Sequence, residues 1–372
     1  MVLVFPGKQS INENKIHKNF KLGSTKHRLS IIRLVQTHFK NHSVDARTVN
    51  KLFILLSKIG SASNWGNVYL VCLRGSNGCE EKMPFALKIQ NPINHHTDAC
   101  EPLRKNDLNT ELLFLKISNY LVMWRVCVHF PITPLLFILP KKKLVRRGSA
   151  NSSTFNAISD KKCDLVGILT EWANQGDVKT WTRHGISFDK GIQLVVQIMM
   201  AIYTLNYIIG YHHNDLHDGN ILISDLETPK TFLYKVYYGK KLIDIRIHNC
   251  SFISRLWDFS YANTVHIHRL SAYKNNKNIR WRSDTDQILK IMGSSVQYRT
   301  LHQVIAKLQQ IHLQHKSFLD YFNYSMYFLA TQSSSVTINQ QLQSNNKEIV
   351  SILKPLTKTQ KNILYKSRID EY

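Results

Sequence analysis

Short apolar runs punctuated by Gly and Asn dominate the first half of the chain after about Lys51, and this is the pattern of strands. Five segments have it: Phe53–Ile59, Val68–Leu73, Phe85–Ile89, Leu135–Leu139 and Leu165–Thr170. Helical spacing of apolar residues occurs at Leu29–Phe39 and again at Leu108–Tyr120. The first half is therefore expected to be mainly β-sheet.

After Gly176 the apolar residues recur with the spacing of helices. The predicted helices are Val178–His184, Phe188–Ile209, Asp284–Met292, Tyr298–His312 and Ser317–Phe328. The second of these is apolar on all sides, which is typical of a buried helix. Thr331–Asn346 is polar and reads as a linker, and a final helix is predicted over Ile349–Leu364.

A strand-rich part followed by a helix-rich part predicts an α+β fold with a small β-rich N-lobe and a larger helical C-lobe. The expected boundaries are a basic extension at 1–50, the N-lobe at 51–173, the C-lobe at 174–330, and a linker with a C-terminal helix at 331–372. The basic, Ser-rich segment 141–162 is expected to be a surface loop inserted in the N-lobe. Residues 1–26 are polar and aperiodic, so little regular structure is expected there.

Composition is that of a globular protein in a reducing compartment. The 372 residues, 43% hydrophobic and 20% charged, are enough for a two-lobed core or for one large domain with tails. The six cysteines form no C-x-x-C pair, which argues against a zinc knuckle and a secreted disulfide framework. MVLVFPGKQS is too short and too interrupted for a signal peptide. Ile192–Ile209 contains Gln193, Gln197 and Asn206, so we expect a core helix and no membrane span.

The formal net charge is +24, and the basic residues are unevenly spread. Residues 1–50 contain nine Lys or Arg against two acids, and residues 141–162 contain seven against one. Phe259–Ser283 contains five and no acid. Such an excess favours polyanionic partners, nucleic acid among them. A genome biased toward Lys, Asn and Ile codons would explain the same excess, and the sequence does not choose between the two.

The segment Tyr211–Ile223, YHHNDLHDGNILI, holds the most informative group of polar residues. His213, Asp215 and Asn220 have the spacing H-x-D-x-x-x-x-N, between a predicted apolar helix and a short apolar strand. This spacing alone would also fit an ordinary polar loop. Asp258, in Trp257-Asp258-Phe259, adds a second carboxylate further along the chain. Carboxylate and amide oxygens suit Mg²⁺ or Mn²⁺ better than zinc.

Two features upstream complete the pattern. Lys88 is the single charge in the apolar run Phe85–Ile89, and a glycine-containing segment, Ile59–Tyr69, lies between the first two predicted strands. Taken alone, a surface lysine and a plain hairpin would explain these two features.

In this order, the motifs resemble those of the eukaryotic-like protein kinases, over Lys51–Leu301 or about two-thirds of the chain. They are most similar to those of haspin-like kinases and of the Ser/Thr kinases of large nucleocytoplasmic DNA viruses (iridovirus type). Three features carry this narrower resemblance: the run D-L-H-x-G-N at Asp215–Asn220, the 38-residue spacing from Asn220 to Asp258 with a hairpin insert at 225–254, and the absence of A-P-E after Asp258.

The resemblance implies roles for the polar residues. Asp215 would accept the proton of the attacking hydroxyl, and Asn220 and Asp258 would bind the Mg²⁺ or Mn²⁺ that bridges the ATP phosphates. Lys88 would hold the α- and β-phosphates. His217, at the position of the usual catalytic-loop lysine, would help to stabilise the γ-phosphate. His213 would be a buried residue that orients the loop.

The resemblance also assigns the remaining contacts to ATP. The loop over the phosphates would be formed by Ile59, Gly60, Ser61, Ser63, Gly66 and Val68, with Ala86 beside the base. Gly60 lies one residue too far upstream, so either the loop has an extra residue or Ser61 and Ser63 replace glycines. Glu111, or failing that Glu101, would pair with Lys88. Backbone groups of Glu171, Trp172 and Ala173 would form hydrogen bonds with the edge of the adenine. Asp177 would form hydrogen bonds with the ribose hydroxyls and cap the next helix.

Departures from the family pattern bear on regulation. Asn214 replaces the Arg that usually clamps a phosphorylated activation loop, and Ser260 replaces the Gly after Asp258-Phe259. We therefore expect activity without activation-loop phosphorylation, and slow turnover because His217 replaces lysine. Asp286 or Asp284 would open the next helix.

The leading expectation is an ATP- and Mg²⁺-dependent Ser/Thr protein kinase of a virus, in the cytoplasm or nucleus of the host cell or packaged in the virion. Basic Phe259–Ser283 would favour acidic or phosphorylated protein substrates. Two alternatives remain: a small-molecule kinase of the choline or aminoglycoside type, and a pseudokinase scaffold or nucleic-acid-binding protein. Retention of Lys88, Asp215, Asn220 and Asp258 together argues against a scaffold.

Overall fold

The structure is a computed structural model. It describes residues 28–30, 33, 35, 53–63, 66–75, 78–90, 107–139, 165–238, 241–259, 262–264, 280–315, 317–339, 348–354 and 356–366. The chain divides into two compact units, one formed by Met1–Leu112 with Ile132–Asn174 and the other by Leu113–Pro131 with Gln175–Tyr372. The division falls inside helix α4 (Asp107–Met123), whose first residues belong to the first unit.

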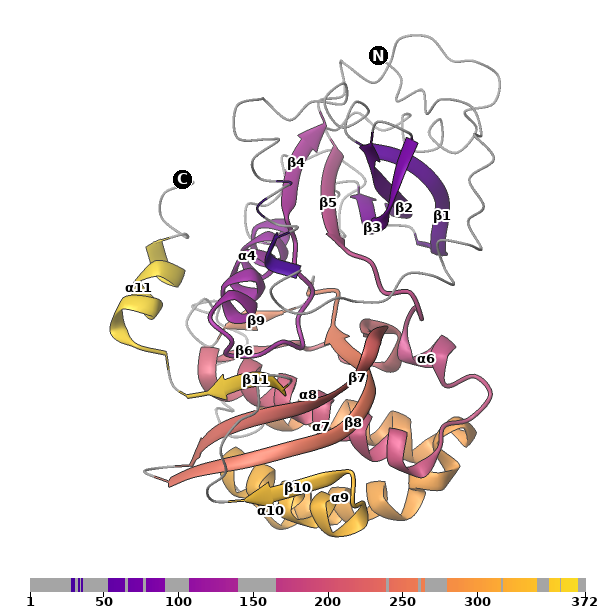
Figure 1. The fold of residues 1–372 in the computed structure, drawn as a ribbon. Helices are drawn as coiled ribbons and strands as arrows, with labels where there is room; N and C mark the ends of the chain where they lie inside the picture. The colour runs from indigo at the N-terminus through magenta and orange to yellow at the C-terminus, as the bar shows by residue number, and fades with distance from the viewer. Residues whose placement is uncertain are drawn as a thin grey trace. The chain divides into compact units, whose positions relative to one another are not determined.

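The first unit is built on a five-stranded antiparallel sheet (Figure 1). In spatial order its strands are β1 (Phe53–Ser63), β2 (Gly66–Gly75), β3 (Gly78–Gln90), β5 (Leu165–Glu171) and β4 (Leu135–Leu139). All five predicted strands are present, and the first three extend beyond their apolar runs. Alternate residues of a strand face opposite sides. Tyr69, Phe85 and Leu87 share the side that is buried.

Part of the predicted N-terminal extension is ordered with this unit. Residues 28–30, 33 and 35 are helical, which confirms the helix predicted over Leu29–Phe39 at the positions of that range that the structure describes. Arg28 and Val35 are both buried. The basic loop predicted at 141–162 lies outside the described residues.

In the second unit, a long buried helix leads to the polar segment that begins at Tyr211. Helix α7 (Phe188–Tyr203) continues as a π-helix over Thr204–Ile209. This stretch is the one described helix long and apolar enough to cross a membrane, and 83% of its most apolar window is buried inside the protein. The expectation of a core helix is confirmed. Gly210 ends the helix with a left-handed φ of 69°, a conformation that glycine adopts without strain.

The second unit contains further, shorter helices. They are α6 (Val178–Trp181), α8 (Arg280–Ser294), α9 (His302–Gln314), α10 (Phe318–Gln332) and α11 (Lys358–Lys366). The helix predicted over Tyr298–His312 begins as a 3-10 helix, Val296–Leu301. A two-residue strand, β6 (Tyr211–His212), pairs with β9 (Asn263–Thr264).

A four-stranded sheet corrects the prediction for the end of the chain. The expected hairpin is present as β7 (Ile221–Tyr238) and β8 (Lys241–Leu256). It is flanked on both sides by later strands: β10 (Val336–Asn339) pairs antiparallel with β8, and β11 (Glu348–Leu353) pairs parallel with β7 (Figure 1). The prediction of a linker at 331–346 and a helix from Ile349 is therefore wrong at these strands. Among the residues described after Ser333, helix occurs only in α11.

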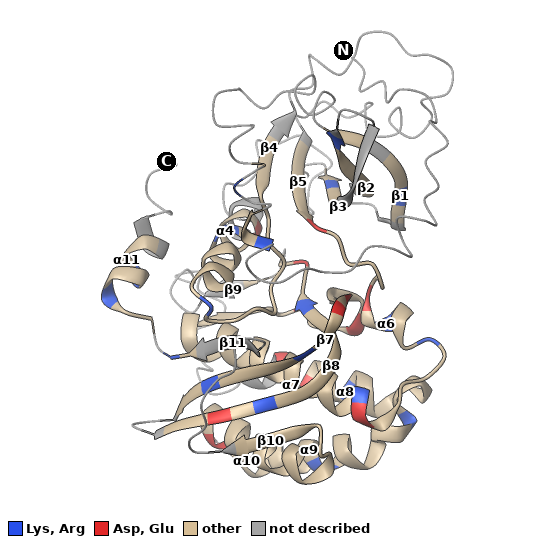
Figure 2. Cartoon of the chain, in the orientation of Figure 1, with Lys and Arg blue, Asp and Glu red and all other residues tan. Residues whose placement is uncertain are grey.

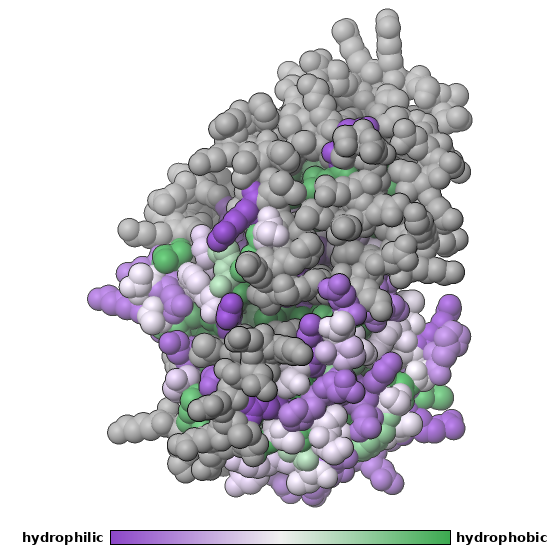
Figure 3. Space-filling model, viewed as in Figure 1, coloured by the Kyte–Doolittle hydropathy of each residue, from purple (hydrophilic) through white to green (hydrophobic). Residues whose placement is uncertain are grey.

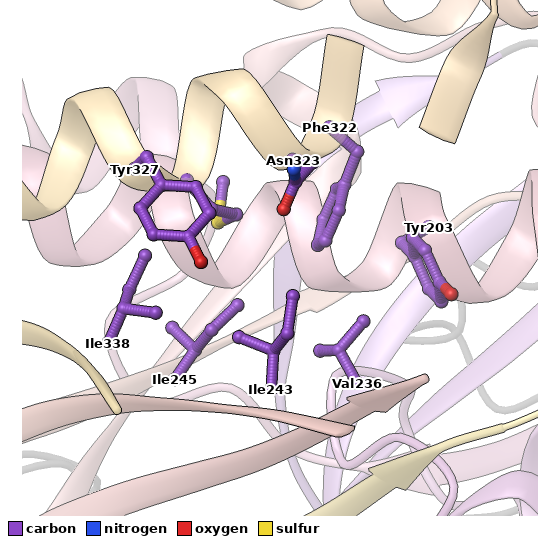
Figure 4. Close-up of a pocket in the computed structure, with 9 residues that line it drawn as sticks. Tyr203, Val236, Ile243, Ile245, Phe322, Asn323, Tyr327 and Ile338 are labelled. Atoms are coloured by element: carbon purple, nitrogen blue, oxygen red, sulfur yellow. The ribbon is translucent and has the colours of Figure 1, made fainter. Parts of the chain in front are cut away.

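Helix α10 packs against one face of this sheet. In Figure 4, Phe322 and Tyr327 of α10 point toward Val236 of β7, Ile243 and Ile245 of β8 and Ile338 of β10. Because β10 supplies part of this apolar surface, residues Val336–Asn339 of the predicted linker belong to the core of the second unit.

Leu353 tests whether β11 holds the sheet together, because its side chain is fully buried opposite Val236 of β7. Leu353→Ala is expected to lower the free energy of unfolding by about 2–5 kcal/mol, as for other buried leucines. Chemical denaturation would measure it. The neighbouring Lys354→Ala, at an exposed position, is the control and should change stability by less than about 0.5 kcal/mol. Equal effects of the two substitutions would contradict a structural role for β11.

The cysteines differ in part from expectation, whereas the described residues do not test the expected basic segments. Figure 2 shows residues of both signs on β7 and β8, and most of the coloured residues on the lower part of the face drawn in Figure 3 are hydrophilic or neutral. The basic segment 141–162 and most of Phe259–Ser283 lie outside the described residues.

Cys72 is disulfide-bonded, whereas the spacing of the cysteines predicts reduced thiols. Cys127 and Cys250 are free and buried, and burial raises the pKa of Cys250 to about 12.

Candidate functional site

One face of the first sheet brings together four residues that the sequence assigned to ATP. Ile59, Val68 and Lys88 stand opposite one another on β1, β2 and β3, so their side chains share a face. Ala86 lies two residues before Lys88 and therefore faces the same way. All four are half-buried, whereas the opposite face is buried. This face is thus accessible along the row that holds the lysine.

Lys88 forms the predicted ion pair with helix α4. Its Nζ donates to Glu111 Oε1 at 3.0 Å, and Gln90 Nε2 donates to Glu111 Oε2 at 3.1 Å. The lysine side chain is 12% exposed and the glutamate 4%. Both carboxylate oxygens of Glu111 are therefore engaged, and the ammonium is held over the sheet. The pairing with Glu111 is confirmed, and the alternative Glu101 lies outside the described residues.

The turn between β1 and β2 is irregular where the sequence predicted a phosphate-covering loop. Ile59 pairs with Val68, and Ser63 pairs with Gly66, so β1 advances four residues while β2 advances two. The additional residues in β1, which include Gly60 and Ser61, account for the displaced glycine in the motif. The structure describes only the backbone at Gly60, Ser61, Ser63 and Gly66.

The residues expected to form the hinge follow β5. Trp172 is buried and packs on Leu70, with Ile59 and Ala86 against the same cluster. Ala173 is also buried. The carboxylate of Glu171 is held by hydrogen bonds within the first unit, so its side chain is engaged in the protein. Contact with a base would therefore have to use the backbone at this position.

In the second unit, a buried carboxylate holds the loop that contains Asp215. Asp284 accepts hydrogen bonds from the backbone N–H of His213 and of Asn214, each at 2.9 Å, and from Asn206 Nδ2 at 3.2 Å. The side chain of Asp286 is 59% exposed and contacts His312. Helix α8 begins at Arg280, so neither aspartate is its first residue. Asp284 is the one that shapes the loop.

His213 is the buried orienting residue that was expected. Its Nε2 lies 2.9 Å from the carbonyl oxygen of Trp257, which requires Nε2 to carry the proton. Burial lowers the pKa of His213, and the charge of Asp284 acts in the opposite direction. The ring also contacts Phe259, with ring centroids 5.0 Å apart. His213 thus connects the loop at Asp215 to the segment at Asp258.

Asp215 and Asn220 are joined by hydrogen bonds. Asn220 Nδ2 donates to the Asp215 carbonyl oxygen at 2.9 Å and to Asp215 Oδ2 at 3.2 Å. His217 Nδ1 accepts the N–H of Gly219 at 3.0 Å, and its Nε2 lies 3.9 Å from Asp215 Oδ2. The side chains of Asp215 and His217 are 41% and 44% exposed. A partly exposed carboxylate held in this way can accept a proton from a bound hydroxyl.

Asn220 and Asp258 lie at the ends of neighbouring strands. Ile221 pairs with Leu256, and Trp257 N–H donates to the Asn220 carbonyl oxygen at 2.8 Å. Asp258 has a φ of 60°, in the left-handed region that is costly for residues other than Gly. Backbone strain of this kind is concentrated at functional positions.

The donor set at this end of the hairpin fits Mg²⁺ or Mn²⁺. Because the amide nitrogen of Asn220 is used by Asp215, its amide oxygen faces away from that carboxylate. This oxygen and the Asp258 carboxylate are hard ligands, which divalent magnesium prefers, together with phosphates and water. Within the described residues no cluster of three or more His, Cys, Asp or Glu forms a metal site. Any metal here would therefore depend on these two residues and on a bound substrate.

Asp177 caps helix α6, as the sequence allowed. Its Oδ1 accepts the N–H of Thr180 at 2.7 Å. The ribose contact proposed for the same side chain remains a prediction.

A further contact to the loop at Asp215 comes from a residue outside the motifs: Leu216 N–H donates to Gln287 Oε1 at 3.0 Å. Sequence reasoning missed Gln287, Gln90 and Arg28, since none of them belongs to a motif.

Comparison with known proteins gives little beyond this geometry. No protein-family model matches the sequence, and none of the curated proteins is similar to it. Among solved structures, the chain is similar to the crystal structure of the PF14_0431 kinase domain, with 18% identity and a TM-score of 0.36. The match covers 58% of this chain and 52% of that chain, or about half of its length. A likeness at this level carries no argument about activity, which must be inferred from the side chains themselves.

Proposed function

We propose that this protein transfers the γ-phosphoryl group of ATP to Ser or Thr hydroxyls of protein substrates. The observation that carries the proposal is the arrangement of Asp215, Asn220 and Asp258. Asp215 uses one oxygen to orient the Asn220 amide, and Asn220 and Asp258 present oxygen ligands at adjacent strand ends. The Lys88–Glu111 pair of the first unit adds a fixed cation suited to phosphate oxygens.

The chemistry follows from these groups. The substrate hydroxyl oxygen would form a bond to the γ-phosphorus while the bond to the bridging oxygen of ADP breaks, and Asp215 would take the hydroxyl proton. Lys88 would hold phosphate oxygens and His217 would offer an N–H to the transferring group. A Mg²⁺ ion bound with ATP would neutralise charge on the phosphates. Asn220 and Asp258 would hold that ion.

The acceptor and the setting are proposals of a finer kind. The basic sequence of Phe259–Ser283 supports acidic or phosphorylated protein segments as substrates, since like charges would repel a basic peptide. The resemblance to viral kinases supports action in the cytoplasm or nucleus of a host cell.

The direct test is transfer of label from ATP with Mg²⁺ or Mn²⁺ to casein, histone, myelin basic protein and the protein itself. Asp258→Asn is measured beside the unchanged protein. We expect the unchanged protein to label its substrates on Ser or Thr. We expect Asp258→Asn to transfer at least about 100-fold less label. ATP binding without transfer to any protein would direct the search to small-molecule acceptors. Absence of ATP binding would contradict the proposal and favour a scaffold.

A further inference from the structure

A buried ion pair joins the N-terminal segment to the end of strand β5. Arg28 Nε donates to Glu171 Oε1 at 2.7 Å, and Arg28 Nη2 donates to Glu171 Oε2 at 2.8 Å. The side chains are 2% and 5% exposed, and the residues are 143 positions apart in sequence. Two parallel charge-assisted hydrogen bonds fix both the distance and the plane of the two groups. Such a pair restrains the backbone on each side of it.

Glu171 is restrained by a further pair of contacts. Its Oε2 also accepts the N–H of Ile132 at 2.8 Å, and its own N–H donates to the Ile132 carbonyl oxygen at 3.0 Å. Removing Arg28 would take two charge-assisted hydrogen bonds and the counter-charge of the pair away from a buried carboxylate, which is unfavourable. Arg28 therefore stabilises Glu171 in this position.

The restrained residue directly precedes the segment assigned to base binding. Glu171 is paired with Phe85 on β3, and Trp172 packs on Leu70 with Ala86 against the same cluster. The backbone from Glu171 to Ala173 is thus held at its first residue by the ion pair and at its second by apolar packing. All these groups belong to the first unit.

We propose that Arg28 is a positioning residue for nucleotide binding. It acts through Glu171 to hold the C=O of Glu171 and the backbone groups of Trp172 and Ala173 in the orientation that pairs with the adenine edge, while the N–H of Glu171 stays bonded to Ile132. The N-terminal segment around Arg28 is then a working part of the nucleotide site and not an appended tail. This inference rests on the proposed function, since it assumes that the protein binds ATP.

The test compares Arg28→Ala with Arg33→Ala in the full chain. Arg33 is an exposed residue of the same helical segment, so its substitution removes the same charge without touching the pair. Arg28→Ala is expected to raise KM and the dissociation constant for ATP by roughly 10- to 100-fold, the range seen when a supporting partner of a binding group is lost. The value of kcat should stay within a few-fold, and preference for ATP over GTP should fall. Arg33→Ala should change none of these.

A double variant keeps the test valid if Arg28→Ala does not fold. Arg28→Ala combined with Glu171→Gln removes both charges of the pair. Because Arg28 acts through Glu171, the double variant should bind ATP no more weakly than Glu171→Gln alone. Millimolar guanidinium should partly restore ATP affinity to Arg28→Ala, and leave Arg33→Ala unchanged.

The outcomes separate the two proposals. A lower melting temperature for Arg28→Ala with KM, base preference and ATP affinity unchanged would show that the pair only stabilises the fold, and the inference would fall. Additive losses in the double variant would overturn the route through Glu171. If the unchanged protein binds no ATP, the proposed function is wrong, and the role proposed for Arg28 is wrong as well.

Discussion

Replacing Asp215 by Asn is expected to reduce phosphoryl transfer by about 100- to 10,000-fold while ATP still binds. The amide cannot accept the hydroxyl proton, but it has nearly the same shape as the carboxylate. Its oxygen can still receive the hydrogen bond from Asn220 Nδ2, so the ligands that face the metal should keep their places. Single-turnover transfer and equilibrium binding of a fluorescent ATP analogue would measure the two effects separately.

Asp218→Asn is the matched control for this prediction. Asp218 lies three residues further along the same loop, in the short 3-10 helix that ends at Asn220, and the chemical change is identical. Its activity should stay within about two- to three-fold of the unchanged protein, as is usual for positions away from the reacting groups. Loss of ATP binding in Asp215→Asn, in proportion to the loss of transfer, would contradict the assignment of Asp215 as the base.

Removing the buried carboxylate of Asp284 is expected to produce the largest loss of stability. Asp284→Ala would remove the acceptor of the buried N–H of His213 and of the part-buried N–H of Asn214 and Nδ2 of Asn206. Each unsatisfied buried donor costs about 1–3 kcal/mol, so the free energy of unfolding should fall by roughly 2–6 kcal/mol. Transfer should fall as well, because Asn214 has a left-handed φ of 62° that this acceptor helps to hold. Urea denaturation would measure the stability.

Asp286→Ala is the comparison that separates the two aspartates. Asp286 is on the same helix, but its carboxylate is mostly exposed and contacts the side chain of His312 and not the loop at Asp215, and a hydrogen bond of this kind contributes about 0.5–1.5 kcal/mol. Similar losses of stability for both variants would mean that the loop is not held by Asp284 in particular.

The chemistry-bearing residues could be predicted because each lies in a local pattern. Lys88 is conspicuous as the single charge in an apolar strand, and its partner Glu111 lies in the next helix. Asp215 and Asn220 stand at a fixed spacing between a helix and a strand. The choice between Asp284 and Asp286 could not be made in this way. Residues two positions apart on a helix differ by about 200° in direction, and only the packing of α8 decides which one is buried.

The elements that were missed depend on partners far away in sequence. Val336–Asn339 is short, with only two apolar residues in a polar surrounding sequence, and it becomes a strand because β8 offers an edge about ninety residues earlier. Glu348–Leu353 has apolar residues whose spacing fits a helix as well as a strand, and pairing with β7 decides it. Arg28 is likewise one of many basic residues near the N-terminus until its ion pair with Glu171 is seen.

Strand β7 is synthesised well before β11, the strand with which it pairs in parallel. Thr231 leaves the ribosome 117 residues before its partner Glu348. At about 5–20 residues per second this is a delay of roughly 6–23 s, during which the β7 edge has no β11 to pair with. An unpaired strand edge is a site for association with other chains. The nascent protein should therefore need chaperone protection in this interval, and slowing translation between β8 and β11 should lower the yield of folded protein.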